Sequence, residues 1–210
     1  MYLVKTPFWL RALYPSLVWR MPGEGKKVYL TFDDGPHETA TPFVLDQLQQ
    51  YGAKASFFCI GKNVAACPEI YERILAEGHA VGNHTYHHVN GWKVSNETYL
   101  EEIVSAAELI HSPLFRPPYG RITRSQQKML VKNNPQHKTI MWDVLSADFD
   151  TRLTGEACLR YVLYHTRPGS IIVFHDSSKA WDRMQYALPR VLAYFSKEGY
   201  TFSALPLLTE

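Results

Sequence analysis

Short apolar runs alternate with stretches of helical spacing from Lys27 onward. The pattern predicts strands at residues 28–32, 55–60, 79–82, 139–145 and 170–174, and helices at residues 41–51, 68–77, 97–110, 125–132 and 181–197, the last interrupted near Pro189. Repeated β-α units favour a parallel sheet, closed or open, flanked by helices. A chain of 210 residues is long enough for one domain with a sizeable core.

A segment of different character precedes these units. Seven apolar residues are spaced to line one side of a short helix: Phe8, Trp9, Leu10, Leu13, Leu17, Val18 and Trp19. We expect this helix to pack on the domain; the alternative is an anchor on a membrane surface. Residues 21–25 have the composition of a linker, so we predict an N-terminal arm at residues 1–25 and a main domain at residues 26–210.

Few features of the sequence point to a compartment or a macromolecular partner. A net charge of +2 without a Lys/Arg block argues against nucleic-acid binding. We see neither a clear signal peptide nor a run long enough to span a bilayer. The odd count of three cysteines argues against a disulfide framework. These observations favour a cytoplasmic monomer, with an envelope-associated protein as the alternative.

Four segments with reactive side chains each follow a strand-like run. They lie at residues 31–36 (Thr-Phe-Asp-Asp-Gly-Pro), 84–88 (His-Thr-Tyr-His-His), 116–120 (Arg-Pro-Pro-Tyr-Gly) and 172–176 (Ile-Val-Phe-His-Asp). Barrel enzymes place their catalytic residues at the C-terminal ends of the strands. We therefore expect the four segments to form one site.

The first two segments supply candidate metal ligands. Asp33 and Asp34 can serve one site only where the strand ends, because neighbouring strand residues point to opposite faces. His84 and His88 would share one face of a helix, with His87 as a rival ligand. Two histidines and one carboxylate form a three-ligand zinc site with a position left for water. The same ligands also suit other divalent transition metals.

The other two segments supply a cation and an imidazole. Arg116 precedes two prolines, a rigid turn that fixes where its side chain points. A cation beside Asp33 would keep that carboxylate ionised. His175 ends a buried strand, either as a catalytic group or as a core histidine bonded to Asp176.

These ordered segments, spread between Lys27 and Leu205, resemble the polysaccharide deacetylase (NodB-homology) family, carbohydrate esterase family four. The resemblance implies a single-domain distorted (β/α) barrel, similar to a TIM barrel. It implies a metal-dependent hydrolase that removes N-acetyl groups from amino-sugar oligo- or polysaccharides of the chitooligosaccharide or peptidoglycan type. The implied cofactor is one divalent transition metal, zinc by preference, with cobalt and nickel as alternatives, and the implied partner is a glycan or amino sugar.

The resemblance also implies a role for each matched residue. The catalytic residues would be the base Asp33, the general acid His175, Arg116, and Tyr119, whose backbone N–H would meet the oxyanion. The metal ligands would be Asp34, His84 and His88. The substrate groove would be formed by Pro118, Tyr119, Asp148, Phe149 and Val173.

The family's Asp-x-x-Asp-Trp motif is only partly kept, at residues 145–149. Asp148 matches, Leu145 stands in place of an acid and Phe149 in place of Trp. A carboxylate here would raise the pKa of the catalytic histidine. The acid that supports His175 is therefore open, with Asp143 and Asp176 as substitutes.

Three other functions are compatible with the same scaffold. They are an O-acetyl esterase, a deformylase of a lipid-linked amino sugar, and a catalytically silent glycan-binding module.

Overall fold

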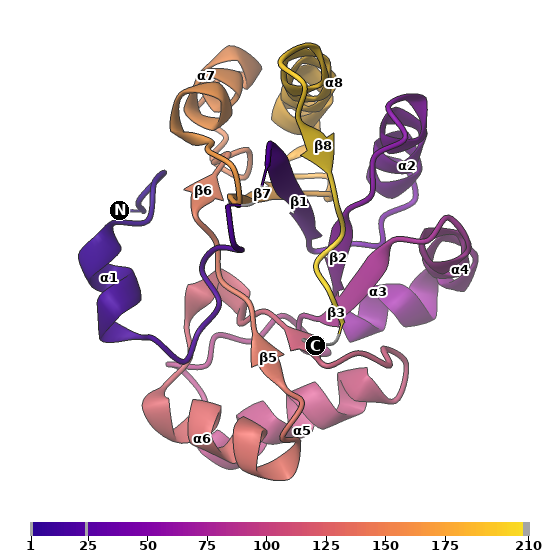
Figure 1. Ribbon diagram of the computed structural model, residues 1–210. Helices are drawn as coiled ribbons and strands as arrows, with labels where there is room; N and C mark the ends of the chain where they lie inside the picture. Colours follow the sequence, from indigo (N-terminus) through magenta and orange to yellow (C-terminus); the bar gives the residue numbers. More distant parts are fainter. Residues whose placement is uncertain (1, 24, 208–210) are drawn as a thin grey trace.

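The computed structural model describes residues 2–23 and 25–207. All neighbouring strands of its sheet are parallel, in the order β5-β4-β3-β2-β1-β7-β6, and β8 adds to β1. The strands are β1 (Lys27–Asp33), β2 (Ser56–Cys59), β3 (Ala80–Asn83), β4 (Leu114–Phe115), β5 (Lys138–Thr139), β6 (Val144–Leu145), β7 (Ile171–His175) and β8 (Thr201–Phe202). Figure 1 shows the sheet curled into a distorted (β/α) barrel with helices outside, which confirms the predicted fold class. Glu24 of the predicted linker, and Met1 and residues 208–210 at the ends of the predicted units, lie outside the described residues.

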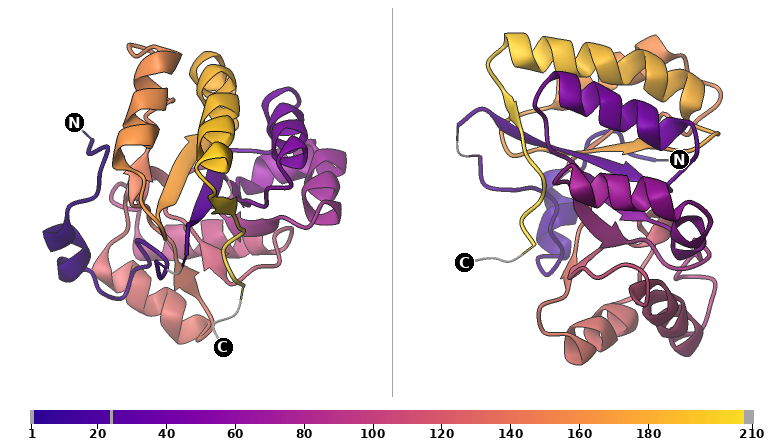
Figure 2. Two further views of the ribbon diagram at one scale, coloured as in Figure 1. Left: turned by 45° about the horizontal axis from the view of Figure 1, so that its top comes forward. Right: turned by 90° about the vertical axis from the view of Figure 1, so that its right-hand side faces the viewer.

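Helices cover the outer face of the sheet. They are α1 (Phe8–Leu13), α2 (Ala40–Gln50), α3 (Gly61–Ala66), α4 (Pro68–Ala76), α5 (Asn96–Ala107), α6 (Arg124–Asn133), α7 (Gly155–His165) and α8 (Trp181–Lys197), with a 3-10 turn η1 (Pro118–Gly120). Figure 2 shows α7, α8 and α2 side by side outside β1 and β7. No helix in the described part of the chain is both long and apolar enough to cross a bilayer.

Strand β1 lies at the centre of the sheet, and both of its faces are buried. One face packs against the helices, and the other faces the interior of the barrel. Leu30 and Phe32 belong to the core between the sheet and the helices. Because side chains alternate along a strand, Thr31 and Asp33 point to the opposite side, into the barrel. The last residue of β1 is therefore an acid held inside the barrel mouth by a strand that is apolar on its outer face.

The N-terminal arm closes the gap between β5 and β6, the two ends of the strand order. Val18 pairs in parallel with Ile140, and Lys5 pairs in antiparallel fashion with Val144. The Val18 N–H donates to the carbonyl of Thr139 at 2.9 Å. Figure 1 shows the arm running along this side of the barrel between β6 and β5. Backbone hydrogen bonds, and not only side-chain packing, therefore hold the arm on the sheet.

The predicted helix of the arm is wrong beyond Leu13. Helix α1 starts after Pro7 and ends before Pro15, which cannot continue a helix. No residue of α1 is buried. The apolar residues that are buried are Leu17 and Trp19, which lie in the extended part of the arm. The apolar residues between Phe8 and Trp19 therefore do not form one helical stripe.

Three other local predictions are corrected. The expected strand at residues 139–145 is two short strands, because the segment between them bends and pairs with the arm. Helix α8 runs without interruption through Pro189, since burial of its apolar face against the core outweighs the missing N–H. Helices α3 and α7 were not predicted.

Candidate active site

The four reactive segments meet at the C-terminal ends of their strands. Asp33 ends β1 and His175 ends β7, and the two residues are direct neighbours in the parallel pairing of these strands. Asn83 ends β3, just before His84, and pairs with Phe115, just before Arg116. The structure thus brings together all four segments, as the sequence predicted.

Asp34, His84 and His88 form a cluster that fits a metal ion. One ligand atom from each lies within 4.8 Å of the others. Nε2 of His88 is 3.2 Å from Oδ1 of Asp34, and Nε2 of His84 is 3.7 Å from the same oxygen. This oxygen is buried and accepts no well-aligned hydrogen bond from the described residues. An uncompensated buried carboxylate oxygen between two imidazole nitrogens is what a bound cation would satisfy.

The protonation of the cluster also suits a cation. Burial lowers the pKa of His84 to about 4, so its imidazole is neutral at neutral pH. Its Nδ1 lies 2.7 Å from the carbonyl oxygen of Arg116, which fixes the Nδ1–H tautomer and leaves Nε2 free for a metal. Burial alone raises the pKa of Asp34, but contact with His88 and the nearby imidazoles hold it well below its usual range.

His87 lies outside the cluster. Its Nδ1 is 2.8 Å from a carboxylate oxygen of Glu102, and its side chain is largely exposed. His84 and His88 come together through an irregular turn and not through the helical spacing that we expected. Positive φ angles at Thr85 (64°) and His88 (61°) make this turn.

Backbone strain is concentrated in this site. Among the described residues other than glycine, positive φ angles occur at Asp34, Thr85, His88, Tyr119 and Ala147. All five lie in the matched segments or beside Asp148. Non-glycine residues adopt this conformation at a cost that the surrounding structure must offset. The surrounding structure therefore keeps these five residues in a backbone conformation that they would not adopt on their own.

Asp33 is paired with a fully buried arginine. Nη1 of Arg116 lies 2.6 Å from Oδ1 of Asp33 and 2.7 Å from the Thr31 hydroxyl. The remaining guanidinium donors reach the carbonyl oxygens of Ile140 and Met141. All of these contacts are inside the barrel, so Arg116 orients Asp33 and does not itself face the opening. The predicted cation beside Asp33 is present.

His175 is supported by Asp148. Nδ1 of His175 lies 2.7 Å from Oδ1 of Asp148, and the His175 backbone N–H donates to Oδ2 at 2.8 Å. Burial alone lowers the pKa of His175, but the charge and hydrogen bond of Asp148 outweigh it and raise the pKa to about 9. His175 is therefore an imidazolium at neutral pH, with Nε2–H available as a proton donor.

Neither proposed substitute for the missing acid contacts His175. Asp143 forms an ion pair with Lys5 of the arm at 2.7 Å and accepts from the Ser170 hydroxyl at 2.6 Å. Burial raises the pKa of Asp176 to about 8, and this carboxyl group accepts from the Gly35 N–H at 3.1 Å. A Cβ atom at position 35 would lie 2.1 Å from that carboxyl group, so glycine is required there.

The predicted groove residues differ in exposure. Tyr119 is 61% exposed, and its ring lies 4.6 Å from that of His88. The ring of Phe149 is 5.2 Å from that of His175. Pro118, Asp148 and Val173 are buried.

Sequence reasoning missed two asparagines that support the cluster of Asp34, His84 and His88. Asn63 Nδ2 donates to the carbonyl of Asp34 at 2.7 Å. Asn83 Oδ1 accepts from the Thr85 N–H at 2.9 Å, which braces the strained turn before His88. The place of Asn83 directly before His84 was the available signal; Asn63 lies in α3, which was itself not predicted.

Comparison with known proteins identifies one family. The polysaccharide deacetylase family model matches residues 20–135. A peptidoglycan-N-acetylglucosamine deacetylase of Bacillus cereus is 35% identical over 192 residues, covering 88% of this chain and 69% of that protein. A chitooligosaccharide deacetylase of Azorhizobium caulinodans is 32% identical over 205 residues, covering 89% and 96%. The crystal structure of a peptidoglycan N-acetylglucosamine deacetylase in complex with 4-naphthalen-1-yl-N-oxidanyl-benzamide has a TM-score of 0.87 and 32% identity, covering 97% and 96%.

Proposed function

Because this chain belongs to the polysaccharide deacetylase family, we propose that it is a metal-dependent hydrolase that removes N-acetyl groups from amino-sugar glycans of the chitooligosaccharide or peptidoglycan type. One observation carries the proposal. An acid–base pair, Asp33 and His175, ends neighbouring strands at the same register beside the cluster of Asp34, His84 and His88. A silent binding module would have no use for this complete set.

The cluster would hold one divalent ion, and we propose zinc. Two neutral imidazoles and one carboxylate are a common zinc ligand set with a position left open, although cobalt and nickel accept the same donors. A bound ion would polarise the amide carbonyl and lower the pKa of a water molecule.

Asp33 would act as the general base. Its carboxylate faces the barrel mouth, and the Arg116 guanidinium at 2.6 Å orients it. It would take the proton of the attacking water. The backbone N–H of Tyr119, in a turn with a φ of 59°, would stabilise the charge that develops on the carbonyl oxygen.

His175 would act as the general acid. The hydrogen bond from Nδ1 to Asp148 orients the ring and leaves the Nε2 proton for the departing nitrogen. An amine is too basic to leave as an anion, so protonation at this nitrogen is required for the C–N bond to break. A pKa of about 9 keeps the proton in place at neutral pH.

Acetate release from N-acetylglucosamine oligomers tests this function. We expect metal-stripped protein to be inactive and zinc to restore release. An Asp33→Asn protein loaded with zinc is the control, because any acetate that it releases does not come from the proposed active site. If wild-type protein binds metal but releases no acetate from any N-acetylated sugar, the proposal is wrong.

A further inference from the structure

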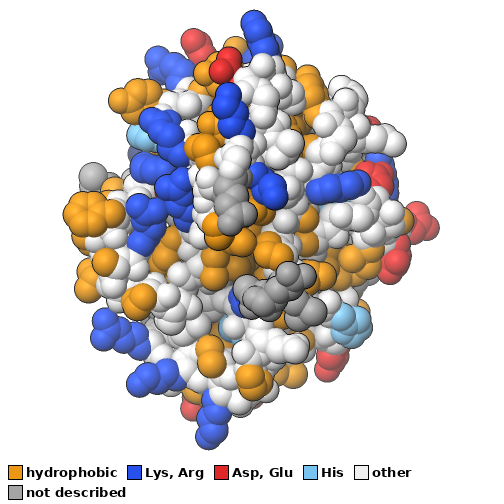
Figure 3. Space-filling model, in the orientation of Figure 1, with side chains coloured by type: hydrophobic (Ala, Val, Ile, Leu, Met, Phe, Trp, Pro, Cys, Tyr) orange, Lys and Arg blue, Asp and Glu red, His pale blue; other side chains and the backbone are white. Residues whose placement is uncertain are grey.

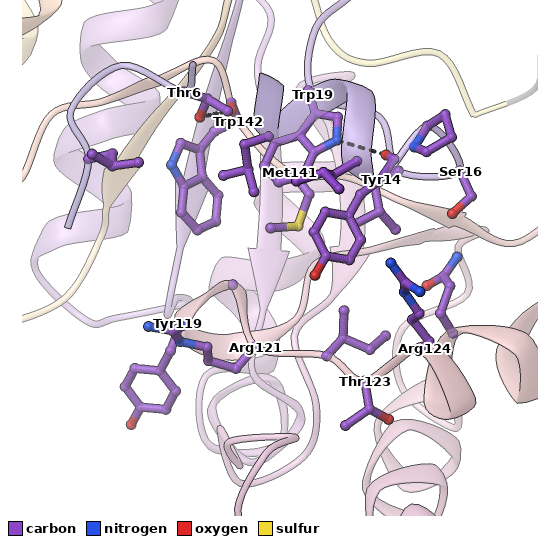
Figure 4. Close-up of a pocket in the computed structure, with 18 of the residues that line it drawn as sticks. Thr6, Tyr14, Ser16, Trp19, Tyr119, Arg121, Thr123, Arg124, Met141 and Trp142 are labelled. Carbon is purple, nitrogen blue, oxygen red and sulfur yellow. Dashed lines mark hydrogen bonds between the residues drawn. The ribbon is translucent and has the colours of Figure 1, made fainter. Parts of the chain in front are cut away.

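A pocket of about 460 Å³ lies beside the reaction centre, between the N-terminal arm and the loop that follows η1. The arm contributes Leu10, Leu13 and Tyr14 to its lining, and the segment after β5 contributes Met141 and Trp142. In Figure 4, Trp142, Met141 and Tyr14 lie along one side, and Tyr119, Arg121 and Arg124 lie along the other. Tyr119 also touches the ring of His88. The pocket therefore begins where the proposed reaction takes place.

The lining is apolar in its interior and cationic along one side. Arg121, Arg124 and Lys128 belong to it, whereas no aspartate or glutamate of the described residues does. Within the described residues, none of these three cations has a carboxylate in salt-bridge range. The guanidinium of Arg121 lies 4.1 Å from the ring centre of Trp92, and that of Arg124 lies 5.7 Å from that of Tyr14. Their charges are therefore available to an anion at the edge of an apolar surface.

The outer face of the arm extends the apolar surface. Phe8 is 76% exposed, Trp9 51% and Leu13 56%. Figure 3 shows hydrophobic side chains over α1 next to Lys and Arg side chains that gather over β6 and the adjoining arm. A contiguous exposed apolar surface of this kind is typical of a ligand-binding groove or a membrane contact.

We propose that this pocket binds the hydrocarbon chain of a lipid-linked amino sugar, whose phosphate lies against Arg121, Arg124 and Lys128. This inference rests on the proposed function, because the amide of the same molecule would lie at the cluster of Asp34, His84 and His88. A glycan chain would bring hydroxyl groups against Leu10, Leu13 and Met141, where they would lose hydrogen bonds to water without replacement. A hydrocarbon chain suffers no such loss, and an anionic linkage matches the three unpaired cations.

Binding can be measured without catalysis, since Trp19, Trp92 and Trp142 line the pocket and report by fluorescence. The probes are octyl phosphate, ethyl phosphate and octyl glucoside at concentrations where each is monomeric. Each buried methylene is worth about fourfold in affinity, so octyl phosphate should bind at least about tenfold more tightly than ethyl phosphate. Leu13→Glu should abolish that difference. Val131→Glu, at an exposed position on α6 outside the lining, should keep it.

The same fluorescence measurement tests whether the cations bind the phosphate. The double variant Arg124→Gln, Lys128→Gln should weaken octyl phosphate several-fold and leave octyl glucoside unaffected. Lys132→Gln, an exposed lysine one turn further along α6, should change neither. Equal affinity for octyl and ethyl phosphate would overturn the inference. So would a Leu13→Glu variant that binds as wild type, or a dimer that Leu13→Glu dissociates, because the occupant would then be a second copy of the chain.

Measurements of kcat/KM distinguish a failure of this inference from a failure of the proposed function. The kcat/KM of the octyl phosphodiester of N-acetylglucosamine should exceed that of the methyl phosphodiester at least about tenfold in wild-type protein. This ratio should fall toward one in Leu13→Glu. A ratio near one, with normal acetate release from N-acetylglucosamine oligomers, would refute the lipid-linked substrate and leave the deacetylase intact. No release from any of these sugars would refute the deacetylase itself.

Discussion

Asp33 and His175 are register partners in the parallel pair of β1 and β7, and each carries a buried neighbour of opposite charge. Arg116 orients the acid of the pair, and Asp148 raises the pKa of the histidine. An acid and an imidazole that are each fixed by a buried partner are suited to act as a general base and a general acid. Neighbouring strands thus place them on either side of one substrate position.

Removal of the Asp148 charge should shift the pH dependence of turnover. The general acid must be protonated, so activity is present below the His175 pKa of about 9 and lost as pH rises through it. Asp148→Asn removes the charge that does most to raise this pKa, while burial still lowers it, so the alkaline limb should move down by at least about one pH unit. The measurement is kcat/KM between pH 5 and 10. Asp143→Asn should keep the limb in place; an unmoved limb in Asp148→Asn would contradict the assignment.

Asp33 and Asp34 are adjacent in sequence but should respond differently to the same substitution. Asp33→Asn should lower turnover by about 10²-fold or more while the protein keeps its metal. Asp34→Asn should lose metal, because it removes the only carboxylate of the described cluster. Metal content after dialysis, measured beside acetate release, checks both. Near-normal turnover in Asp33→Asn would remove it as the base.

Arg116→Met should destabilise the fold because it leaves the Asp33 carboxylate buried without its cation. Breaking a buried ion pair from one side costs about 3–5 kcal/mol. Adding Asp33→Asn to the same chain should recover part of that loss, since no buried charge then remains. Urea denaturation of the two variants gives the comparison. A double variant less stable than Arg116→Met would show that the charge on Asp33 is not the source of the loss.

Two tryptophans of the arm should differ sharply in their effect on stability. Trp19 is buried and its indole N–H donates to the carbonyl of Tyr14 at 3.1 Å, so Trp19→Ala should cost about 3 kcal/mol or more. Trp9 is half-exposed on α1, and Trp9→Ala should stay within about 0.5 kcal/mol of wild type. The free energy of unfolding in urea is the measurement. Equal effects would mean that the arm is not packed as described.

Much of the barrel could be predicted from the sequence because its strands and most of its helices have one consistent burial pattern. Residues 28–32 and 170–174 are buried throughout and apolar except for Thr31 and Ser170, as expected of strands between helices and a filled barrel. Helix α3 is only six residues long, and helix α7 buries only two of its eleven residues. The arm could not be predicted, because its buried residues follow contacts with segments over a hundred positions away.

The site was predicted in its composition but less well in its geometry. The resemblance to the family's motifs implied Asp34, His84 and His88 as ligands, yet His88 reaches the cluster through a strained turn that no spacing rule describes. The family motif has an acid where this chain has Leu145, so the sequence also suggested that His175 lacked a supporting acid. Asp148 supplies it because the loop, with a positive φ at Ala147, turns both oxygens of that carboxylate toward His175.

The arm that closes the barrel also sets an order of events during synthesis. Val18 leaves the ribosome long before Ile140, and Lys5 long before Val144. Until these late partners emerge, the nascent chain carries an unpaired edge and an uncovered indole at Trp19. Pairing between such distant positions slows folding. The barrel can therefore close only after β5 and β6 have left the ribosome.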